Sequence, residues 1–299
     1  MNEQTDMPTL MAQHMYLSWQ QVPSVEHKHT LFSGFNLNDH QKRATCDERV
    51  WSSVVVADIT MSVKKGELVC LVGRSGCGKT TILHALSGLM KPVMGQVFFH
   101  GTDITGRPGH VSYMFQKDLL LEHKRIIDNV CLPLTLRRVA QAEAYGQAQP
   151  LFERFGLAGC EYKWPHELSG GMRQRAAFLR TYLMGSDCIL LDEPFSALDA
   201  LTRVAMRNWY CDIAHDLGIA TLAITHDVDE AATMASRVYV LGHMSKNTEG
   251  ALQNQQVPTT AHTIVGEVHV PAHDVSMHAD AFALTPEFLS CKKEILSLL

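Results

Sequence analysis

The sequence has no uninterrupted apolar run of the roughly 18 to 20 residues that a helix needs to cross a bilayer. Its N-terminal stretch has neither a basic start nor a long apolar core, so we expect no signal peptide and a cytoplasmic location. The 26 basic and 31 acidic residues form no long blocks, and the formal net charge is -5. This balance argues against a nucleic-acid partner held mainly through its phosphates.

Cysteine occurs eight times, but never as a C-x-x-C pair. We therefore expect the cysteines to be reduced and mostly buried. The 16 histidines include clusters at 27–29 and 269–273, and neither cluster has cysteine or carboxylate partners in a ligand pattern. Solvated loop histidines are the better interpretation than a metal centre.

Three apolar runs read as buried strands. The first, 66–73 (GELVCLVG), ends in glycine, and the other two are followed by polar residues: 188–194 (CILLDEP) and 219–227 (IATLAITHD). Residues 200–217 have the periodicity of an amphipathic helix. The first strand is followed by a glycine loop and a helix that we expect to turn four side chains toward a core: Ile82, Leu83, Leu86 and Leu89. This order predicts an α/β fold with a mostly parallel central sheet.

The remaining segments differ from this pattern. Residues 117–186 have helical periodicity and few strand-like runs, which predicts a helical subdomain inserted between two strands. Residues 20–50 and 243–260 are polar with weak periodicity and read as loop-like insertions. Residues 263–270 alternate like an edge strand, and 286–299 resemble a short amphipathic helix that begins at proline.

Residues 73–80 (GRSGCGKT) match the phosphate-loop pattern G-x-x-x-x-G-K-[ST] between a strand and a helix. Glycines let successive N–H groups point at one phosphate chain, and the helix adds its positive N-terminal end. Lys79 is expected to reach the β- and γ-phosphates, and the Thr80 hydroxyl to ligate Mg²⁺. The predicted nucleotide-binding residues here are Gly73, Ser75, Gly76, Cys77, Gly78, Lys79, Thr80 and Thr81.

Asp192 and Glu193 end an apolar strand, where open α/β sheets bind their ligands. We predict that Asp192 holds Mg²⁺, directly or through water, and that Glu193 polarises the water that attacks the γ-phosphate. Taken alone, the pair could be an ordinary acidic strand end. The phosphate loop upstream favours the functional interpretation.

Residues 168–175 (LSGGMRQR) resemble the signature sequence of ABC-family ATPases and open an apolar helix. Taken alone, an S-G-G turn before a helix is an ordinary cap. In the family, the signature of one subunit completes the nucleotide site of its partner. The resemblance therefore implies that Ser169, Gly170 and Gly171 contact a nucleotide across a homodimer, or across a pair of ATPase subunits.

Three further matches follow the family's order. Gln116 resembles the glutamine loop, which senses the γ-phosphate, and His226 resembles the switch histidine. Residues 195–199 (FSALD) resemble the loop that crosses the dimer interface and ends here in Asp199. The resemblance implies catalytic roles for Gln116, Glu193 and His226, a metal contact for Gln116 and a nucleotide contact for Asp199.

The family also places an aromatic side chain on the adenine ring, near the end of its first strand. Trp19 occupies that place and is our preferred adenine contact, with Tyr16 as a core residue. Because 20–50 intervene before the next strand, spacing alone makes Trp51 the alternative.

Together these motifs are similar to the ATP-binding subunits of bacterial ABC importers for nitrate, sulfonate, taurine or thiamine-precursor-like solutes. The resemblance implies an ABC-type phosphate-loop NTPase with an antiparallel β edge over residues 8–242 and a C-terminal extension over 243–299. It also implies ATP and Mg²⁺ as cofactors, peripheral attachment to the cytoplasmic face of the membrane and, indirectly, a solute-binding protein.

An integral membrane permease is the implied direct partner. The apolar surface at about 117–140 is expected to receive one of its cytoplasmic helices, although packing inside the helical subdomain explains the same residues. Three alternatives stay open at this point: an exporter ATPase, a soluble ABC ATPase of translation or DNA repair, and a phosphate-loop kinase.

Overall fold

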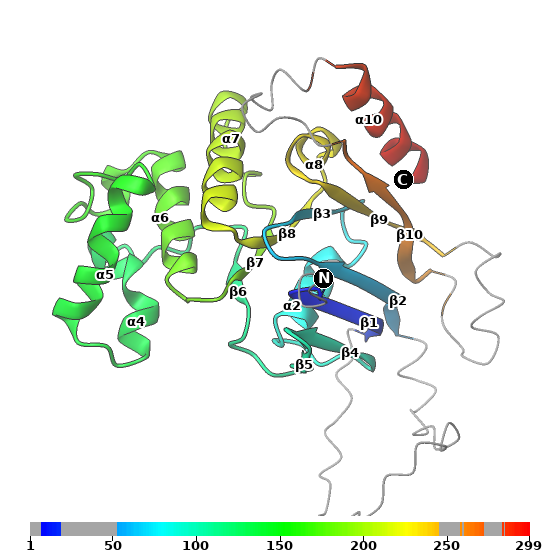
Figure 1. Cartoon of the computed structure of the whole chain (residues 1–299), viewed down its shortest axis with the longest axis horizontal. Coiled ribbons are helices and arrows are strands. Elements are labelled where there is room, and N and C mark those ends of the chain that lie inside the picture. The colour runs from blue at the N-terminus through cyan, green and yellow to red at the C-terminus, as the bar shows by residue number, and fades with distance from the viewer. Residues whose placement is uncertain (1–6, 19–52, 245–257, 259, 272–282, 284) are drawn as a thin grey trace, which may run out of the picture.

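A computed structural model describes residues 7–18, 53–244, 258, 260–271, 283 and 285–299. These residues form one mixed sheet with the strand order β5-β4-β1-β2-β10-β9-β3-β8-β7-β6 (Figure 1). The strands are β1 (Leu10–Ser18), β2 (Val54–Val63), β3 (Leu68–Gly73), β4 (Met94–Phe99), β5 (Thr102–Asp103), β6 (Ser112–Met114), β7 (Cys188–Asp192), β8 (Ala220–Thr225), β9 (Arg237–His243) and β10 (His262–His269).

The helices are α2 (Lys79–Leu86), α3 (Ile126–Val130), α4 (Leu132–Leu136), α5 (Gln141–Arg154), α6 (Gly170–Tyr182), α7 (Ala200–Leu217), α8 (Val228–Met234) and α10 (Pro286–Leu298), with a 3₁₀ turn at Pro165–Glu167. None of the helices in the described ranges is long and apolar enough to span a membrane.

The sheet has a parallel half and an antiparallel half. Strands β9, β3, β8, β7 and β6 are parallel to one another, whereas β1 pairs antiparallel with β2 and β4. The parallel strands β7 and β8 are buried along their whole length, which is why their sequences are continuous apolar runs. The predicted α/β fold with an antiparallel β edge is confirmed.

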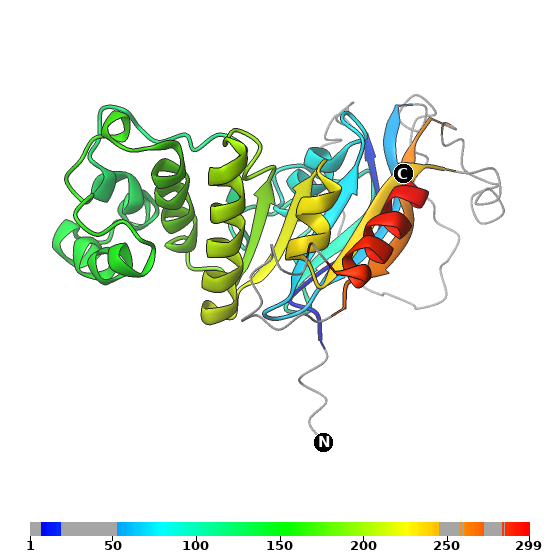
Figure 2. The ribbon, with the colours of Figure 1, turned by 90° about the horizontal axis from the view of Figure 1, so that it is seen from above.

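Alternate side chains of the parallel strands enter two different cores. In β3, Val69 and Leu71 pack with α2 on one face, and Cys70 and Val72 pack with α7, α8 and α10 on the other. Helices α3 to α6 lie in the chain between the adjacent strands β6 and β7 and form a lobe beside the sheet (Figures 1 and 2). One hydrophobic core runs from the sheet into this lobe.

Two expectations about individual segments are wrong. Strand β10 is not an edge strand, because it lies between β2 and β9. Its alternating pattern reports which face is buried and carries no information about its lateral hydrogen bonds. Leu89 does not face the core: α2 ends at Leu86, the chain turns at Gly88 with φ +77°, and Leu89 is 55% exposed.

Other expectations hold. Helix α7 coincides with the predicted range 200–217, α10 begins at its proline, and Tyr16 is a core residue at 2% exposure. The seven described cysteines are free, and all but Cys211 are buried, as expected. The insertion 20–50, most of 243–260, Cys46 and the histidine cluster at 27–29 lie outside the described residues.

Replacing Phe178 tests how much the packing of α6 on α7 contributes to stability. Its ring packs against Phe195, Trp209 and Tyr210, at centroid distances of 6.2, 5.6 and 4.7 Å. We expect Phe178→Ala to lower the free energy of unfolding by about 3–5 kcal/mol in denaturant titrations, because it leaves a cavity between α6 and α7. The control Leu201→Ala, at an 85% exposed position of α7, should change it by less than about 0.5 kcal/mol. Equal losses for both variants would contradict this account.

Candidate nucleotide-binding site

The phosphate loop connects β3 to the N-terminus of α2. Gly78 has φ +101°, and a Cβ there would lie 2.4 Å from Val56 Cγ2, so both the backbone conformation and the available space require glycine. At Gly73 a Cβ would lie 2.9 Å from the carbonyl oxygen of Leu241. Ser75 and Gly76 are exposed on the loop, whereas Cys77 and Thr81 are buried beneath it. Burial also raises the pKa of the Cys77 thiol.

Lys79 holds its ammonium over this loop. Its Nζ donates hydrogen bonds to the carbonyl oxygens of Gly73 at 2.7 Å and Arg74 at 3.0 Å, and the residue is 5% exposed. A buried cation beside the N-terminus of α2 is a strong attractor for an anion.

Asp192 is fixed by two hydroxyl groups from distant parts of the chain. Thr80 Oγ1 donates to its Oδ1 at 3.2 Å, and Tyr113 Oη donates to its Oδ2 at 3.0 Å. Burial raises the pKa of the Asp192 carboxyl, and the two hydrogen bonds oppose that shift. The carboxylate is thus oriented at the end of β7 beside the first helical turn after the phosphate loop.

Glu193 is the centre of a second cluster. Its Oε1 lies 3.3 Å from His226 Nδ1, and its Oε2 accepts a hydrogen bond from Gln116 Nε2 at 3.3 Å. Gln116 also donates to Ser196 Oγ at 3.2 Å, and that hydroxyl donates to the Glu193 carbonyl oxygen. Glu193 has φ +44°, in the left-handed region that non-glycine residues adopt only uncommonly.

The sheet topology explains why these residues meet. Gln116 follows β6, Glu193 follows β7, His226 follows β8 and the phosphate loop follows β3. These strands are consecutive neighbours in the order β3-β8-β7-β6 and run parallel. Their carboxyl ends therefore lie at one edge of the sheet, as is typical of ligand sites in open α/β folds.

Ser169 and Asp199 have local roles as helix caps. Ser169 Oγ accepts a hydrogen bond from the Met172 N–H at the start of α6, and Asp199 Oδ1 accepts one from the Thr202 N–H at the start of α7. The Thr202 hydrogen bond lowers the pKa of the Asp199 carboxyl, because it stabilises the charged form. Among the described residues, no hydrogen bond joins either side chain to the phosphate loop. Their predicted nucleotide contacts remain predictions.

Gly170 and Gly171 open α6 beside α7. A Cβ at Gly170 would lie 3.5 Å from Leu198 Cδ2, and one at Gly171 would lie 3.1 Å from Thr202 Cγ2. Close packing of α6 on α7 therefore explains a small residue at position 171. Trp19 and Trp51, the two candidates for the adenine contact, lie outside the described residues.

The oxygen donors near the phosphate loop suit Mg²⁺. The described residues contain no group of three or more His, Cys, Asp or Glu side chains able to hold a metal ion. What they offer is the Asp192 carboxylate, with the Thr80 hydroxyl in contact with it. Mg²⁺ is commonly bound by one or two carboxylates together with substrate phosphates and water, so this set fits a metal shared with a nucleotide. The predicted amide ligand Gln116 has its amide nitrogen directed at Glu193.

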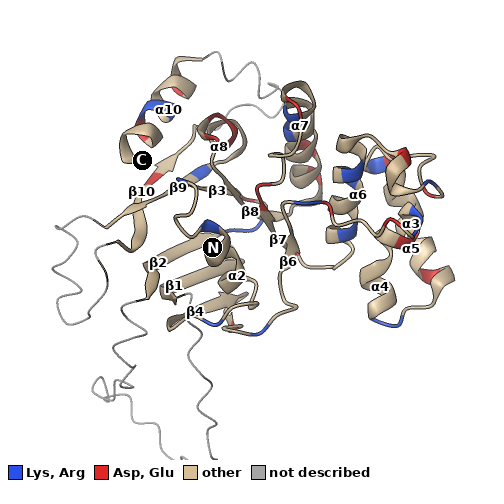
Figure 3. Ribbon diagram, turned by 180° about the vertical axis from the view of Figure 1, so that it is seen from behind, with Lys and Arg blue, Asp and Glu red and all other residues tan. Residues whose placement is uncertain are grey.

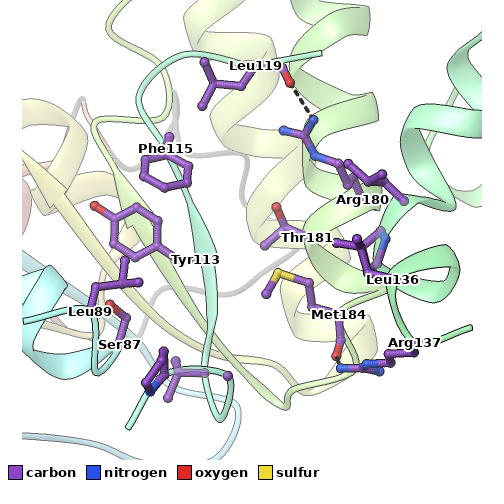
Figure 4. A pocket seen from close by; sticks show the side chains of 15 residues that line it. Ser87, Leu89, Tyr113, Phe115, Leu119, Leu136, Arg137, Arg180, Thr181 and Met184 are labelled. Carbon is purple, nitrogen blue, oxygen red and sulfur yellow. Dashed lines mark hydrogen bonds between the residues drawn. The ribbon is translucent and has the colours of Figure 1, made fainter. Parts of the chain in front are cut away.

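An apolar groove of about 570 Å³ lies between the sheet and the helical lobe (Figure 4). One wall contains Leu89, Tyr113, Phe115 and Leu119, and the other contains Leu136, Arg180, Thr181 and Met184. Four of these apolar side chains are more than 40% exposed: Leu89, Phe115, Leu119 and Leu136. We call this feature the lobe groove.

Helix α6 holds the chain segment that follows Gln116. Arg180 donates hydrogen bonds to the carbonyl oxygens of Asp118 and Leu119, and Arg173 Nε lies 3.3 Å from Asp118 Oδ2. Figure 3 shows basic residues along α6, where these two arginines lie. These contacts attach the segment after Gln116 to α6, the helix that Ser169 caps.

Sequence reasoning missed Tyr113 and Ser196 as site residues. A tyrosine inside a buried strand reads as core, and nothing in its neighbours indicates a contact with Asp192. Ser196 lies within the motif at 195–199, but its hydrogen bond to Gln116 depends on the pairing of β6 with β7.

Replacing Lys79 tests the phosphate loop directly. We expect Lys79→Ala to raise the dissociation constant of a fluorescent ATP analogue by at least about tenfold, because charge-assisted hydrogen bonds to the phosphates are lost. Fluorescence titration measures this change, and Lys91→Ala, at an exposed lysine, is the control. Binding by Lys79→Ala equal to that of the control would rule out this loop as the phosphate site.

Comparison with known proteins agrees with this geometry. Residues 56–196 match the family model described as ABC transporter. A formylaminopyrimidine import ATP-binding protein of Halalkalibacterium halodurans is 39% identical over 189 residues, which cover 63% of this chain and 74% of that protein. A sulfate/thiosulfate import ATP-binding protein of Neisseria meningitidis is 38% identical over 193 residues, which cover 62% of this chain and 54% of that protein. The chain thus spans about half the length of this relative.

Solved structures share the fold. A dimeric bacterial ABC transporter cassette superposes with a TM-score of 0.61 at 18% identity, covering 88% of this chain and 100% of that one. A component of an ABC transporter complex of Clostridium perfringens gives a TM-score of 0.61 at 20% identity, with 78% and 84% coverage. These structures show the shared fold, and the relative that is 39% identical over 74% of its length shows the family: the chain belongs to the ABC transporter family of ATP-binding proteins.

Proposed function

We propose that this chain binds and hydrolyses ATP as the energising subunit of a bacterial ABC importer, whose solute passes through a separate membrane permease. The observation that carries the proposal is the convergence of Gln116, Glu193 and His226 at the sheet edge that also holds the phosphate loop. A carboxylate held between an amide and an imidazole suits the activation of a water molecule.

Each residue has a role in this mechanism. The phosphate loop and Lys79 bind the phosphate chain. Thr80 and Asp192 would hold Mg²⁺, which would supply positive charge against the phosphates. Glu193 accepts the proton of the attacking water. His226, 3.3 Å from the Glu193 carboxylate, orients that water and the γ-phosphate. Gln116 connects this site to the lobe groove, because the segment after it is held by Arg180.

Two such chains would bind face to face. Ser169 and Asp199 are exposed and lack hydrogen bonds to the phosphate loop of their own chain in the described structure, and Leu201 beside them is 85% exposed. We propose that these groups complete the nucleotide site of a partner chain. Two bound nucleotides then join the pair, and hydrolysis separates it.

The lobe groove is the proposed docking site for a short cytoplasmic helix of the permease. The apolar residues near 117–140 fall into two groups: some pack inside the helical lobe, and others are available to a docked helix. Leu120, Ile126, Ile127, Val130 and Leu134 are buried in the lobe, whereas Leu119 and Leu136 face the groove. A groove with exposed leucines and an arginine at its wall suits an amphipathic helix that carries a carboxylate.

For the solute, we propose a small molecule of the nitrate, sulfonate, taurine or thiamine-precursor type, captured by a solute-binding protein outside the membrane. The support is the sequence similarity around the signature and switch segments, together with a relative named for formylaminopyrimidine import. Other relatives are named for sulfate and thiosulfate import, so these two anions should be tested as solutes in the same assay. Transport assays in membranes that contain the permease distinguish these solutes.

Glu193→Gln tests the hydrolytic step. We expect ATP turnover to fall by about 10²- to 10⁴-fold while ATP binding is retained, because the amide cannot accept the proton of water. Phosphate release measures turnover, and light scattering should show an ATP-dependent dimer. Glu143→Gln, at an exposed glutamate of α5, is the control. Turnover by Glu193→Gln within twofold of the control would exclude Glu193 as the base.

Leu136→Glu tests the docking site. Leu136 is 76% exposed at the lobe groove, so a carboxylate there should oppose burial of the apolar face of the amphipathic helix without disturbing the core. We expect Leu136→Glu to recover at least about tenfold less permease than the parent chain in pull-downs from solubilised membranes, measured by mass spectrometry. Tyr162→Glu, at a 66% exposed site outside the groove, should recover normal amounts. Equal recovery by both variants would contradict the proposed docking site.

A further inference from the structure

Tyr113 links the lobe groove to the nucleotide site through one side chain. Its ring forms part of the groove wall beside Phe115, with a centroid distance of 4.7 Å (Figure 4). Its hydroxyl donates to Asp192 Oδ2 at 3.0 Å. The groove and the carboxylate that would hold Mg²⁺ are therefore separated by the length of a phenol ring.

The hydroxyl of Tyr113 orients the carboxylate of Asp192. Asp192 is 8% exposed, and a buried carboxylate depends on hydrogen bonds to keep its orientation. Oδ1 is in contact with Thr80, the other proposed metal-holding residue, so the bond from Tyr113 to Oδ2 sets the rotation of the carboxylate. Without that bond, the carboxylate of Asp192 can turn away from the orientation in which its Oδ1 contacts Thr80.

Contacts on the backbone and on the ring of Tyr113 limit how far the ring can move independently of β7. Its backbone is paired with Leu190 of β7, two residues before Asp192, and its ring also lies 5.6 Å from the ring of His84. Tyr113 is 8% exposed, whereas its neighbour Phe115 is 44% exposed. A helix seated in the groove would press on both rings, but only Tyr113 contacts the site carboxylate.

We propose that Tyr113 is a positioning residue: its hydroxyl orients Asp192 for Mg²⁺, and its ring makes that orientation sensitive to what occupies the lobe groove. The inference rests on the proposed nucleotide-binding function and adds a route of communication to it. This route is separate from the one through Gln116 and Arg180, because it ends at Asp192 rather than at Glu193. Coupling of this kind is reciprocal, so Mg²⁺ binding must also alter the groove wall.

Tyr113→Phe tests the first half of the proposal, because it removes the hydroxyl and keeps the ring. A fluorescent ATP analogue is titrated with Mg²⁺, and its binding is also measured in excess EDTA. We expect the Mg²⁺ concentration for half-maximal enhancement of nucleotide binding to rise about tenfold, since a hydrogen bond to a charged group is lost. Binding in EDTA should stay within twofold. An unchanged Mg²⁺ dependence would overturn the proposal.

Two further variants separate positioning from general structural damage. Tyr145→Phe removes a tyrosine hydroxyl that donates to a different carboxylate, Asp128 Oδ1 in the helical lobe, and its Mg²⁺ dependence should match that of the unmodified chain. In an Asp192→Asn background, Tyr113→Phe should cause no further change, because both act on the same interaction. Additive effects would overturn the proposal. If Tyr113→Phe does not fold, Tyr113→Met, which also lacks the hydroxyl, replaces it.

Hydrogen–deuterium exchange tests the second half. In the Glu193→Gln chain with ATP, we expect Mg²⁺ to slow amide exchange at least twofold in peptides that span residues 111–121. Adding Tyr113→Phe should abolish that response. A response that survives the loss of the hydroxyl would overturn the coupling. Absence of ATP analogue binding by the unmodified chain would instead contradict the proposed function, so the two failures are distinguishable.

Discussion

Parallel pairing of β3, β8, β7 and β6 is the constraint on which the candidate site depends. It brings the phosphate loop, His226, Glu193 and Gln116 to one edge of the sheet, although these residues are spread over more than half of the chain. Each strand is buried on both faces, so it cannot shift in register without moving an apolar set out of its core. The sheet therefore fixes the positions of the strand ends that precede these residues.

The site is connected to the helical lobe by polar contacts as well as by apolar packing. The core around Phe178 fixes α6 against α7, and the arginines of α6 hold the segment after Gln116. Tyr113 approaches the same edge from inside the sheet. Movement of the lobe relative to the sheet would therefore reach Glu193 through the segment that contains Gln116. The proposed role as a subunit that responds to a membrane partner would need connections of this kind.

Several site residues also have an ordinary structural role. Ser169 and Asp199 cap helices, Gly171 allows close packing, and Lys79 bonds to the carbonyls of its own loop. These local interactions hold the residues in place within a single chain. The proposed second nucleotide-binding surface would thus add little cost to the fold, because exposed helix ends carry N–H groups that suit anions.

Local patterns were enough to predict the phosphate loop, the acidic strand end and the α/β class, because each is a pattern of glycine, charge or apolar periodicity in the sequence. It also predicted α7 and α10 closely, since their periodicity and end signals agree. It placed β10 at an edge and Leu89 in a core, and both were wrong. Three features became visible only in the folded chain: the neighbours of β10, the hydrogen bond between Tyr113 and Asp192, and the leucines that line the lobe groove. Periodicity reports which face of an element is buried, whereas lateral pairing and long-range contacts depend on how the whole chain packs.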